Sequence, residues 1–410
     1  MVHGIRVFVF LSFFISGIVA AAPADFSVSP DNSQKVLLDT IARAHTSLDI
    51  NIYMITSKAL ESVLLDRIKA GVAINMLVEA QPFGGKIVSV EKDVLDHLKA
   101  AFDAQGKSRL LIMTNKKSKV GRRYVFDHAK YVIIDASIAY ISSENFVGSG
   151  VMSYPDNKGN RGWEVLLGDS ALAKNLLSIF KTDTDTRNSD VVDYDPSLVD
   201  LMPPFPQNGK FDPTANRRTV KPFSPGHGEV KGARLCTSPK SLACLTDFIR
   251  SAKTSLDIQQ LSLPLYWPSP TKEKRVNPLL GEMLSAARRG VVVRVMMSPG
   301  RAEDEGKIEA NLPEPVPPPY DSNETIHYLR EIAKRERIKI DAVEINTEAL
   351  QLKILHNKGM VADGHLVFLG SINGTENSVN SNREVGVALD SGDAAKYFGE
   401  VINFDWNHSN

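Results

Sequence analysis

Apolar and polar positions along the chain follow two alternating periods, and the same succession occurs twice. In each copy, a helix-spaced apolar pattern leads into an alternating, β-branched stretch that is typical of a strand. Two pairs of segments match closely: 44–50 with 252–258, and 71–78 with 290–297. Each copy is therefore predicted to follow the order β-α-β-α-β-β and to form a mixed sheet flanked by helices, which is an α/β fold.

The repeat divides the chain into predicted parts. Between the copies lies a proline-rich stretch without sustained periodicity, which indicates a connector. The predicted parts are a signal peptide at 1–24, a first half at 27–185, a connector at 186–233 and a second half at 234–410.

The first residues have the pattern of a secretory signal peptide. Arg6 precedes an apolar run at 7–20, and small residues follow at 20–24. An uncleaved anchor is the alternative, but the run is shorter than the roughly 17–25 residues that span a bilayer. We expect the mature protein to be secreted or periplasmic.

Composition and cysteine content exclude few classes of function. The 48 basic and 48 acidic residues cancel, so no global field draws the protein toward nucleic acid. In an oxidising compartment, Cys236 and Cys244 either close a small disulfide loop or remain as two partly buried thiols. Neither has a histidine beside it in sequence, so a nucleophilic cysteine is not expected.

A third pair of segments contains the candidate chemistry. Each copy has His-x-Lys followed after four residues by Asp: His128, Lys130 and Asp135, then His356, Lys358 and Asp363. Side chains two apart on a strand share a face, so each imidazole lies beside an ammonium group. Such a pair suits a phosphate, because the lysine neutralises oxygens while the imidazole attacks or moves a proton.

Asparagine and glutamate residues accompany both motifs. Asn145 and Asn373 each follow the histidine of their copy by 17 residues, and an amide donates to a phosphoryl oxygen without adding charge. Farther on, Glu164 and Glu384 are candidates to hold the Nδ1 proton of the histidine in their own half. A duplicated structural domain, or a decayed inactive duplicate, is the alternative to an enzyme.

These paired motifs resemble those of the phospholipase D superfamily, and the likeness covers nearly the whole chain after the signal segment. The resemblance implies two halves packed about a pseudo-two-fold axis, with both motifs facing one cleft. It implies that His128 attacks phosphorus to form a phosphohistidine, and that His356 acts as general acid and then as base. The remaining implied roles are phosphate binding by Lys130, Lys358, Asn145 and Asn373, and support within the site by Asp135 and Asp363. The first copy departs from the family pattern by having Ser142-Ser143 where Gly-Ser is usual.

Neither a cofactor nor a metal is expected, because no cluster of histidines and carboxylates has metal-ligand spacing. The expected partner is a phosphodiester, with phospholipid preferred and single-stranded nucleic acid as the alternative. An inactive anion- or lipid-binding protein is the alternative from another class. A basic run at 116–123 either guides a polyanion or is a solvated loop, and an apolar loop at 263–268 either contacts lipid or a base or covers the core. We expect a monomer with transient membrane contact.

Overall fold

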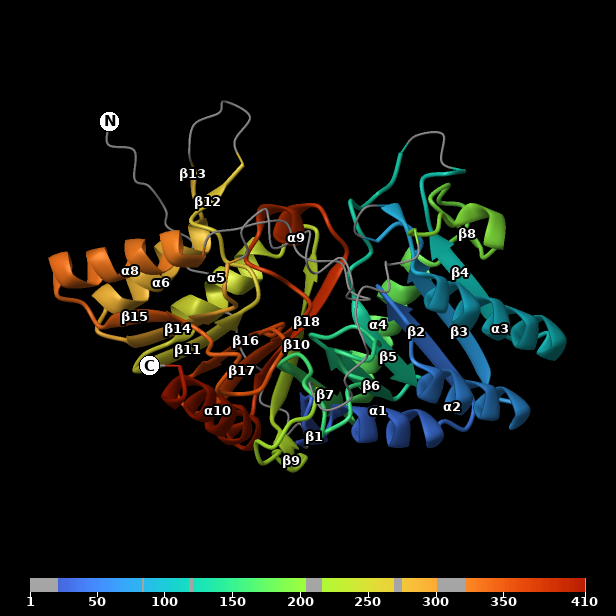
Figure 1. The fold of residues 1–410 in the computed structure, drawn as a ribbon, viewed down its shortest axis with the longest axis horizontal. Coiled ribbons are helices and arrows are strands. Elements are labelled where there is room, and N and C mark those ends of the chain that lie inside the picture. Colours follow the sequence, from blue (N-terminus) through green and yellow to red (C-terminus); the bar gives the residue numbers. More distant parts are fainter. Residues whose placement is uncertain are drawn as a thin grey trace, which may run out of the picture.

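Two similar α/β halves lie side by side in the computed structural model (Figure 1). The first half runs from β1 to α4 and the second from β10 to α10. The predicted fold class, with two repeated halves that each contain a mixed sheet flanked by helices, is confirmed. The structure describes residues 21–82, 85–117, 121–203, 216–268, 275–300 and 322–409.

The first sheet has nine strands in the order β8-β4-β3-β2-β5-β6-β7-β1-β9. Strands β2, β3 and β4 are parallel, and all the other pairs are antiparallel. Their bounds are β1 Ala22–Ser29, β2 Ser47–Ile52, β3 Ala73–Glu79, β4 Arg109–Met113, β5 Lys130–Ile134, β6 Ile138–Ser142, β7 Gly162–Leu167, β8 Val191–Asp193 and β9 Gly226–Val230.

The second sheet repeats seven of these strands in the same order, β10-β18-β17-β16-β11-β14-β15. Here β11, β14 and β15 are the parallel strands, as β2, β3 and β4 are in the first half. The bounds are β10 Gly232–Ser238, β11 Ser255–Gln260, β14 Val292–Met297, β15 Ile340–Glu344, β16 Lys358–Ala362, β17 Leu366–Gly370 and β18 Glu384–Asp390, with a separate ribbon of β12 Tyr266–Trp267 and β13 Arg275–Val276.

Helices cover the outer face of each sheet and also fill the space between the halves. The two helices between the halves are capped by side chains: Asp169 accepts from the N–H of Leu172 before α4, and Ser391 accepts from the N–H of Ala394 before α10. The helices are α1 Ser33–Ala42, α2 Lys58–Lys69 and α3 Ser89–Gln105 on the first sheet, α5 Leu242–Ser251, α6 Pro278–Arg288 and α8 Ser322–Glu336 on the second, α4 Ser170–Asp183 and α10 Gly392–Asn407 between them, and the short α9 Glu376–Asn380 and η2 Pro196–Leu198.

One apolar core is shared by both halves. It contains residues of β5, β6 and β7 together with residues of β16, β17 and β18, and α4 and α10 complete it. Trp163 of β7 stacks on Phe398 of α10 with ring centroids 4.5 Å apart. A Cβ at Gly359 of β16 would lie 2.4 Å from the same indole. The sheets therefore approach so closely that each half completes the core of the other.

The predicted connector contributes to the first sheet. Strand β8 pairs with β4 at one edge, and β9 pairs with β1 at the other. At the N-terminus, residues 1–20 of the predicted signal peptide lie outside the described residues, whereas Ala22–Ala24 already belong to β1. In the described part of the chain, none of the helices has the length and apolar character needed to span a membrane.

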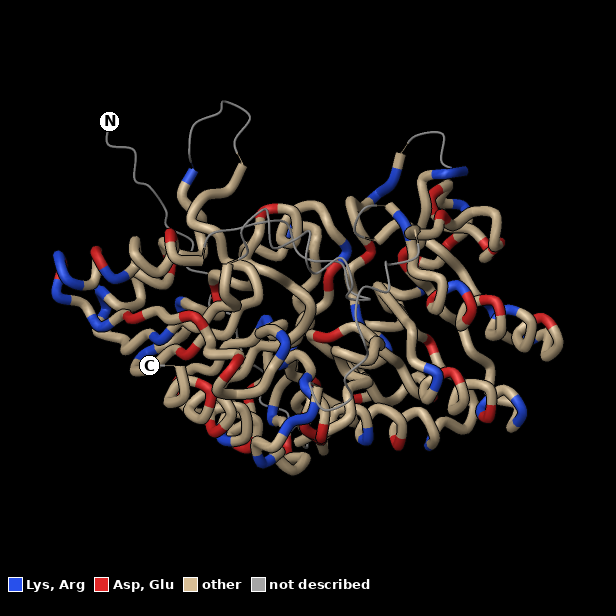
Figure 2. Tube along the Cα trace, viewed as in Figure 1, with Lys and Arg blue, Asp and Glu red and all other residues tan. Residues whose placement is uncertain are grey.

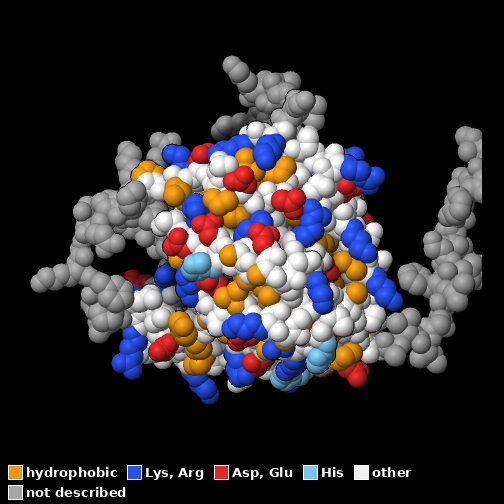
Figure 3. Space-filling view, turned by 90° about the vertical axis from the view of Figure 1, so that its right-hand side faces the viewer, with side chains coloured by type: hydrophobic (Ala, Val, Ile, Leu, Met, Phe, Trp, Pro, Cys, Tyr) orange, Lys and Arg blue, Asp and Glu red, His pale blue; other side chains and the backbone are white. Residues whose placement is uncertain are grey.

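Charged residues of both signs are distributed over the two halves (Figure 2). On the outer helices they form pairs one turn apart, such as Lys35–Asp39 and Lys92–Asp96. On the face over α3 and β8, basic side chains lie among acidic and apolar ones (Figure 3). Positive and negative charges are therefore balanced locally on the surface as well as in the net charge of the chain.

Candidate active site

The two motif histidines lie at one seam between the halves. The backbone N–H of His128 donates to the carbonyl of Arg383 at 2.8 Å, and that of His356 donates to the carbonyl of Arg161 at 2.9 Å. Each bond joins the motif of one half to an arginine of the other half, and that arginine directly precedes strand β18 or strand β7. The seam therefore has a reciprocal, pseudo-two-fold arrangement that brings both motifs together.

Each imidazole is paired with a buried glutamate of the opposite half. Nδ1 of His128 lies 2.8 Å from Oε2 of Glu384, and Nδ1 of His356 lies 3.1 Å from Oε2 of Glu144. Burial alone raises the pKa of a carboxyl, yet His128 and Lys130 hold the pKa of Glu384 below its usual value, and His356 and Lys358 do the same for Glu144. Both glutamates are therefore anions suited to accept an Nδ1–H of the paired ring, which leaves Nε2 as the nitrogen available for chemistry.

The His128 imidazole is neutral at physiological pH. Burial lowers the pKa of His128 to about 4, against the opposing effect of Glu384 and with a further lowering by Lys130. Its side chain retains 14% exposure. With Nδ1–H donated to Glu384, the Nε2 lone pair is available as a nucleophile or base.

Both lysines are buried beside their histidines. Lys130 donates to the carbonyl of His128 at 2.6 Å, and its ammonium lies 5.1 Å from the centre of the Tyr53 ring. Lys358 lies 3.1 Å from Nδ1 of His356 and 3.4 Å from the carbonyl of Ser143, which belongs to the other half. Two ammonium groups thus add positive charge to a largely desolvated seam, where it acts strongly on an anion.

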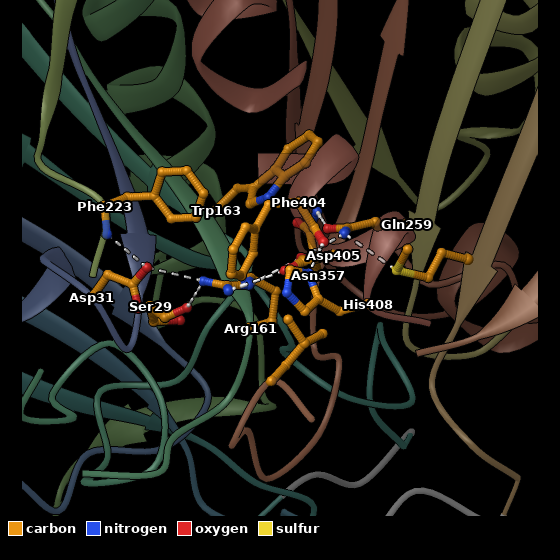
Figure 4. Close-up of polar contacts among 12 residues, drawn as sticks. Ser29, Asp31, Arg161, Trp163, Phe223, Gln259, Asn357, Phe404, Asp405 and His408 are labelled. Carbon is orange, nitrogen blue, oxygen red and sulfur yellow. Dashed lines mark hydrogen bonds and ion pairs between the residues drawn. The ribbon is translucent and has the colours of Figure 1, made fainter. Parts of the chain in front are cut away.

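Crossed ion pairs fix the arginines that hold this seam. Arg161 donates to both carboxylate oxygens of Asp405 at 3.1 Å and to Asp31 at 3.3 Å, and all three side chains are fully buried (Figure 4). Arg383 pairs equivalently with Asp183 at 2.8 Å. Asp405 is on α10 and Asp183 on α4, so each arginine binds the helix of the opposite half.

Comparison with known sequences identifies the family. A family profile described as "Cardiolipin synthase, PLD-like domain" matches residues 37–184 and 245–406, which is more than half of the chain. The chain belongs to the phospholipase D superfamily. No curated protein sequence matches it.

Two solved structures of low sequence identity share the fold of this chain. A phosphatidylserine synthase from Haemophilus influenzae has 11% identity and a TM-score of 0.63, covering 94% of this chain and 87% of that one. A polyphosphate kinase from Porphyromonas gingivalis has 12% identity and a TM-score of 0.51, covering 93% and 50%. Nuc from Salmonella typhimurium, described as a phospholipase D family member, has 20% identity and a TM-score of 0.34, covering 42% and 98%.

The predicted role of Glu164 is wrong. Its Oε2 accepts from the hydroxyls of Ser27 and Ser33. The first-half carboxylate that does pair with a histidine is Glu144, and its partner is His356 of the second half. Glu384 does hold a histidine, but it holds His128 of the other half rather than His356. Glu144 stands within the Ser-Glu-Asn triplet of the first copy, where the second has Ser-Ile-Asn, and this extra acid was the available signal.

The motif aspartates lie outside the seam, contrary to the predicted supporting role within the site. Asp135 and Asp363 follow β5 and β16 and accept from three successive backbone N–H groups each, at 45–47 and 253–255. These hydrogen bonds outweigh burial and lower the pKa of each carboxyl to about 2. The aspartates therefore fix the turn that enters β2 or β11.

The remaining predicted residues have clear positions. Asn145 and Asn373 occupy equivalent places after β6 and β17, and within the described residues the Oδ1 atom of each has no hydrogen-bond partner. Cys236 and Cys244 form a disulfide. The structure, over the ranges it describes, contains no group of three or more side chains suited to hold a metal.

The basic run and the apolar loop are engaged within the protein. Lys116 pairs with Asp200, Arg122 with Glu79 and Arg123 with Asp190, while residues 118–120 lie outside the described part. In the loop at 263–268, Leu263, Leu265 and Trp267 are buried in the core of the second half. Three basic residues of the run therefore form ion pairs within the protein, and the apolar side chains of the loop contribute to the core.

Proposed function

We propose that this protein is a phosphodiesterase of the phospholipase D type, which hydrolyses or transfers phosphatidyl groups through a phosphohistidine. The observation that supports it most is the seam itself, where two imidazoles are oriented by crossed glutamates and flanked by buried lysines. A neutral imidazole with its Nδ1–H held by a carboxylate is suited to nucleophilic attack.

The reaction we propose has two displacements at phosphorus. The Nε2 lone pair of His128 forms a bond to phosphorus while the bond to the leaving oxygen breaks, and Nε2 of His356 gives its proton to that oxygen. Water or an alcohol then attacks phosphorus and gives a proton to His356, and the P–N electron pair returns to His128. One hard displacement is thereby divided into two easier ones.

Four side chains would bind the phosphate in this scheme. Lys130 and Lys358 supply the positive charge that a phosphodiester anion needs at the moment of attack. Asn145 and Asn373 stand at equivalent positions after β6 and β17, and an amide NH₂ donates without adding charge. Their roles follow from the resemblance and from this symmetry.

Apolar side chains next to His128 favour a lipid substrate. The Tyr53 ring lies 4.7 Å from the imidazole and packs with Met54, Val147 and Phe126. Val125, just before the motif, is 46% exposed. The family description and the phosphatidylserine synthase of similar fold agree with this choice. Single-stranded nucleic acid is the alternative, and the pairing of Lys116, Arg122 and Arg123 of the basic run with carboxylates weakens one argument for it.

We further propose that the protein acts outside the cytoplasm as a monomer. Strand β1 starts at Ala22, so cleavage just before it would leave the sheet whole. Both histidines and both glutamates come from one chain, which supports a site formed within a monomer.

A substrate panel in the presence of EDTA tests the proposal. Wild type is expected to release a soluble head group from phospholipid vesicles and to form a phosphatidyl alcohol when a primary alcohol is added. His128→Ala and His356→Ala should each lose at least about 100-fold in turnover. His365→Ala is the matched control, since this histidine is exposed and its ring lies within hydrogen-bond distance of the Asp363 carbonyl, away from the seam.

The outcomes separate the alternatives. Cleavage of single-stranded DNA with no action on vesicles would assign a nuclease instead, and no turnover of either substrate would leave an anion-binding protein. Full turnover by either motif variant would rule out the two-histidine mechanism, and loss of activity in EDTA would rule out a metal-independent one.

A further inference from the structure

The two halves hold their orienting carboxylates at positions that are not equivalent. Ser142 and Gly370 each follow the histidine of their half by 14 residues. Across the next strand pair, Ser142 is opposite Glu164, and Gly370 is opposite Gly386. Glu164 and Gly386 are therefore equivalent positions. Two residues earlier in each strand, Gly162 of β7 is equivalent to Glu384 of β18.

A second register gives the same equivalence. Strand β1 ends at Ser29, which pairs with Gly162, and strand β10 ends at Ser238, which pairs with Glu384. The residue that follows each serine is a proline. The first half therefore lacks a carboxylate at the place where the second half has one.

Glu144 occupies the space that a side chain at position 162 would need. A Cβ built on Gly162 would lie 2.3 Å from Cγ and 2.5 Å from Oε1 of Glu144. The residue equivalent to Glu144 in the second half is Ile372, which is buried in the core of that half. The pairs Glu144/Gly162 and Ile372/Glu384 are thus two ways of bringing one carboxylate to an imidazole.

The polar surroundings of the two carboxylates match despite the different attachment points. Nδ2 of Asn160 donates to Glu144 at 3.2 Å, and Nδ2 of the equivalent Asn382 donates to Glu384 at 3.1 Å. Both carboxylates are fully buried, and each is within hydrogen-bond distance of Nδ1 of the opposite half's histidine. A buried anion needs such partners, so the match indicates the same task.

We propose that Glu144 is the positioning residue for His356, and that Gly162 must lack a side chain so that Glu144 can reach it. This inference rests on the proposed function for its kinetic consequence, though not for its geometry. Glu144 accepts the Nδ1 proton, which fixes the Nδ1–H tautomer of the neutral ring, and it balances the charge when Nε2 is also protonated and gives that proton to the leaving oxygen. Gly162 contributes only the vacant space.

An exchange of positions tests this. Glu144→Ala and Gly162→Glu should each lower turnover of a phosphodiester with an alkoxide leaving group by about 10²-fold or more. The double variant Glu144→Ala/Gly162→Glu places the carboxylate where the second half has it, and should recover at least about tenfold over Glu144→Ala. Glu164→Gln is the matched control, because burial raises the pKa of Glu164 to about 8 and the neutral amide replaces a neutral acid.

The leaving group separates positioning from a general loss of structure. With p-nitrophenolate, which departs without a proton, Glu144→Ala should retain the first displacement as a burst of about one equivalent and lose the second. A proportionate loss for both leaving groups, or no recovery by the double variant, would overturn the inference.

A measurement independent of activity keeps the two proposals distinguishable. ¹⁵N NMR of labelled imidazoles, assigned with His356→Ala, should show the Nδ1–H tautomer of His356 in wild type and a changed signal in Glu144→Gln. An unchanged His356 signal overturns the role of Glu144 even when wild type turns over lipid. A wild type that turns over no phosphodiester but shows the expected change contradicts only the proposed function.

Discussion

The charge state of His128 depends on a balance between burial and its carboxylate partner. Burial lowers the pKa to about 4, even though Glu384 favours the charged imidazole. An unfolded chain titrates near the ordinary histidine pKa of roughly 6.5. The same desolvation that makes the ring a nucleophile therefore makes folding sensitive to acid.

The stability of wild type should fall between pH 7 and 4 through this residue. In that window the unfolded chain binds a proton at His128 that the folded chain does not, so the free energy of unfolding decreases as pH decreases. The loss attributable to His128 is about 3 kcal/mol over the full window. Urea denaturation of wild type and His128→Asn at several pH values measures it as a change in their difference, which a constant difference across the window would contradict.

Sequence reasoning identified the histidines and lysines because their spacing is local, and it missed how they are oriented. His128 and Glu384 are 256 positions apart, and no local pattern shows which half completes which imidazole. The neighbouring pattern Trp163-Glu164-Val165 resembled Arg383-Glu384-Val385, but the true alignment is shifted by two residues. Glu144 was visible only as an acid inserted where the second copy has Ile372.

At the scale of elements, the two crossed arginines connect strands β7 and β18, which are equivalent in the two halves, to a helix of the other half. Arg161 joins β7 to α10 through Asp405, and Arg383 joins β18 to α4 through Asp183. Asp31 is shared between Arg161 and Arg218. Two guanidinium groups therefore depend on two carboxylates in a fully buried cluster.

Removing one carboxylate from this cluster should be strongly destabilising. Asp405→Asn would leave Arg161 and Arg218 with Asp31 as their one carboxylate partner among the described residues, which is a net buried positive charge. The expected cost is about 3–5 kcal/mol in the free energy of unfolding, measured by urea denaturation. Glu282→Gln is the control, because it breaks the exposed pair with Arg250 and should cost less than about 1 kcal/mol. Equal effects of the two substitutions would contradict this account.

The central strands were predictable and the edge strands were not. Segments 44–50 and 71–78 have the apolar alternation that matches their repeats, and they became β2 and β3. Strands β8 and β9 come from the stretch taken as a connector, since each is short and pairs on one side only. Pairing with an existing sheet edge supplies the hydrogen bonds that their own composition does not predict.

At the scale of the whole molecule, the shared core makes the two halves one cooperative unit. The central core contains residues from both sheets, so neither half can unfold without exposing apolar surface of the other.

Unfolding should therefore follow one transition wherever it is observed. Trp163 belongs to β7 of the first sheet and reports on its contact with the second half, whereas Trp267 and Trp406 lie in the second half. Variants that retain only Trp163 or only Trp267, with phenylalanine at the other tryptophan positions, should show coincident urea midpoints for fluorescence and circular dichroism. Separated midpoints for the two probes would show that the halves unfold independently.

The reciprocal seam also has a consequence for heredity. Each half gives a carboxylate to its neighbour and takes one in return, so a single coding unit for either half already specifies every part that a symmetric pair of itself would need. Once two such units are joined in one reading frame, a mutation of the carboxylate in the upstream unit changes the environment of a histidine encoded far downstream. The two units must then be inherited, and must change, as partners.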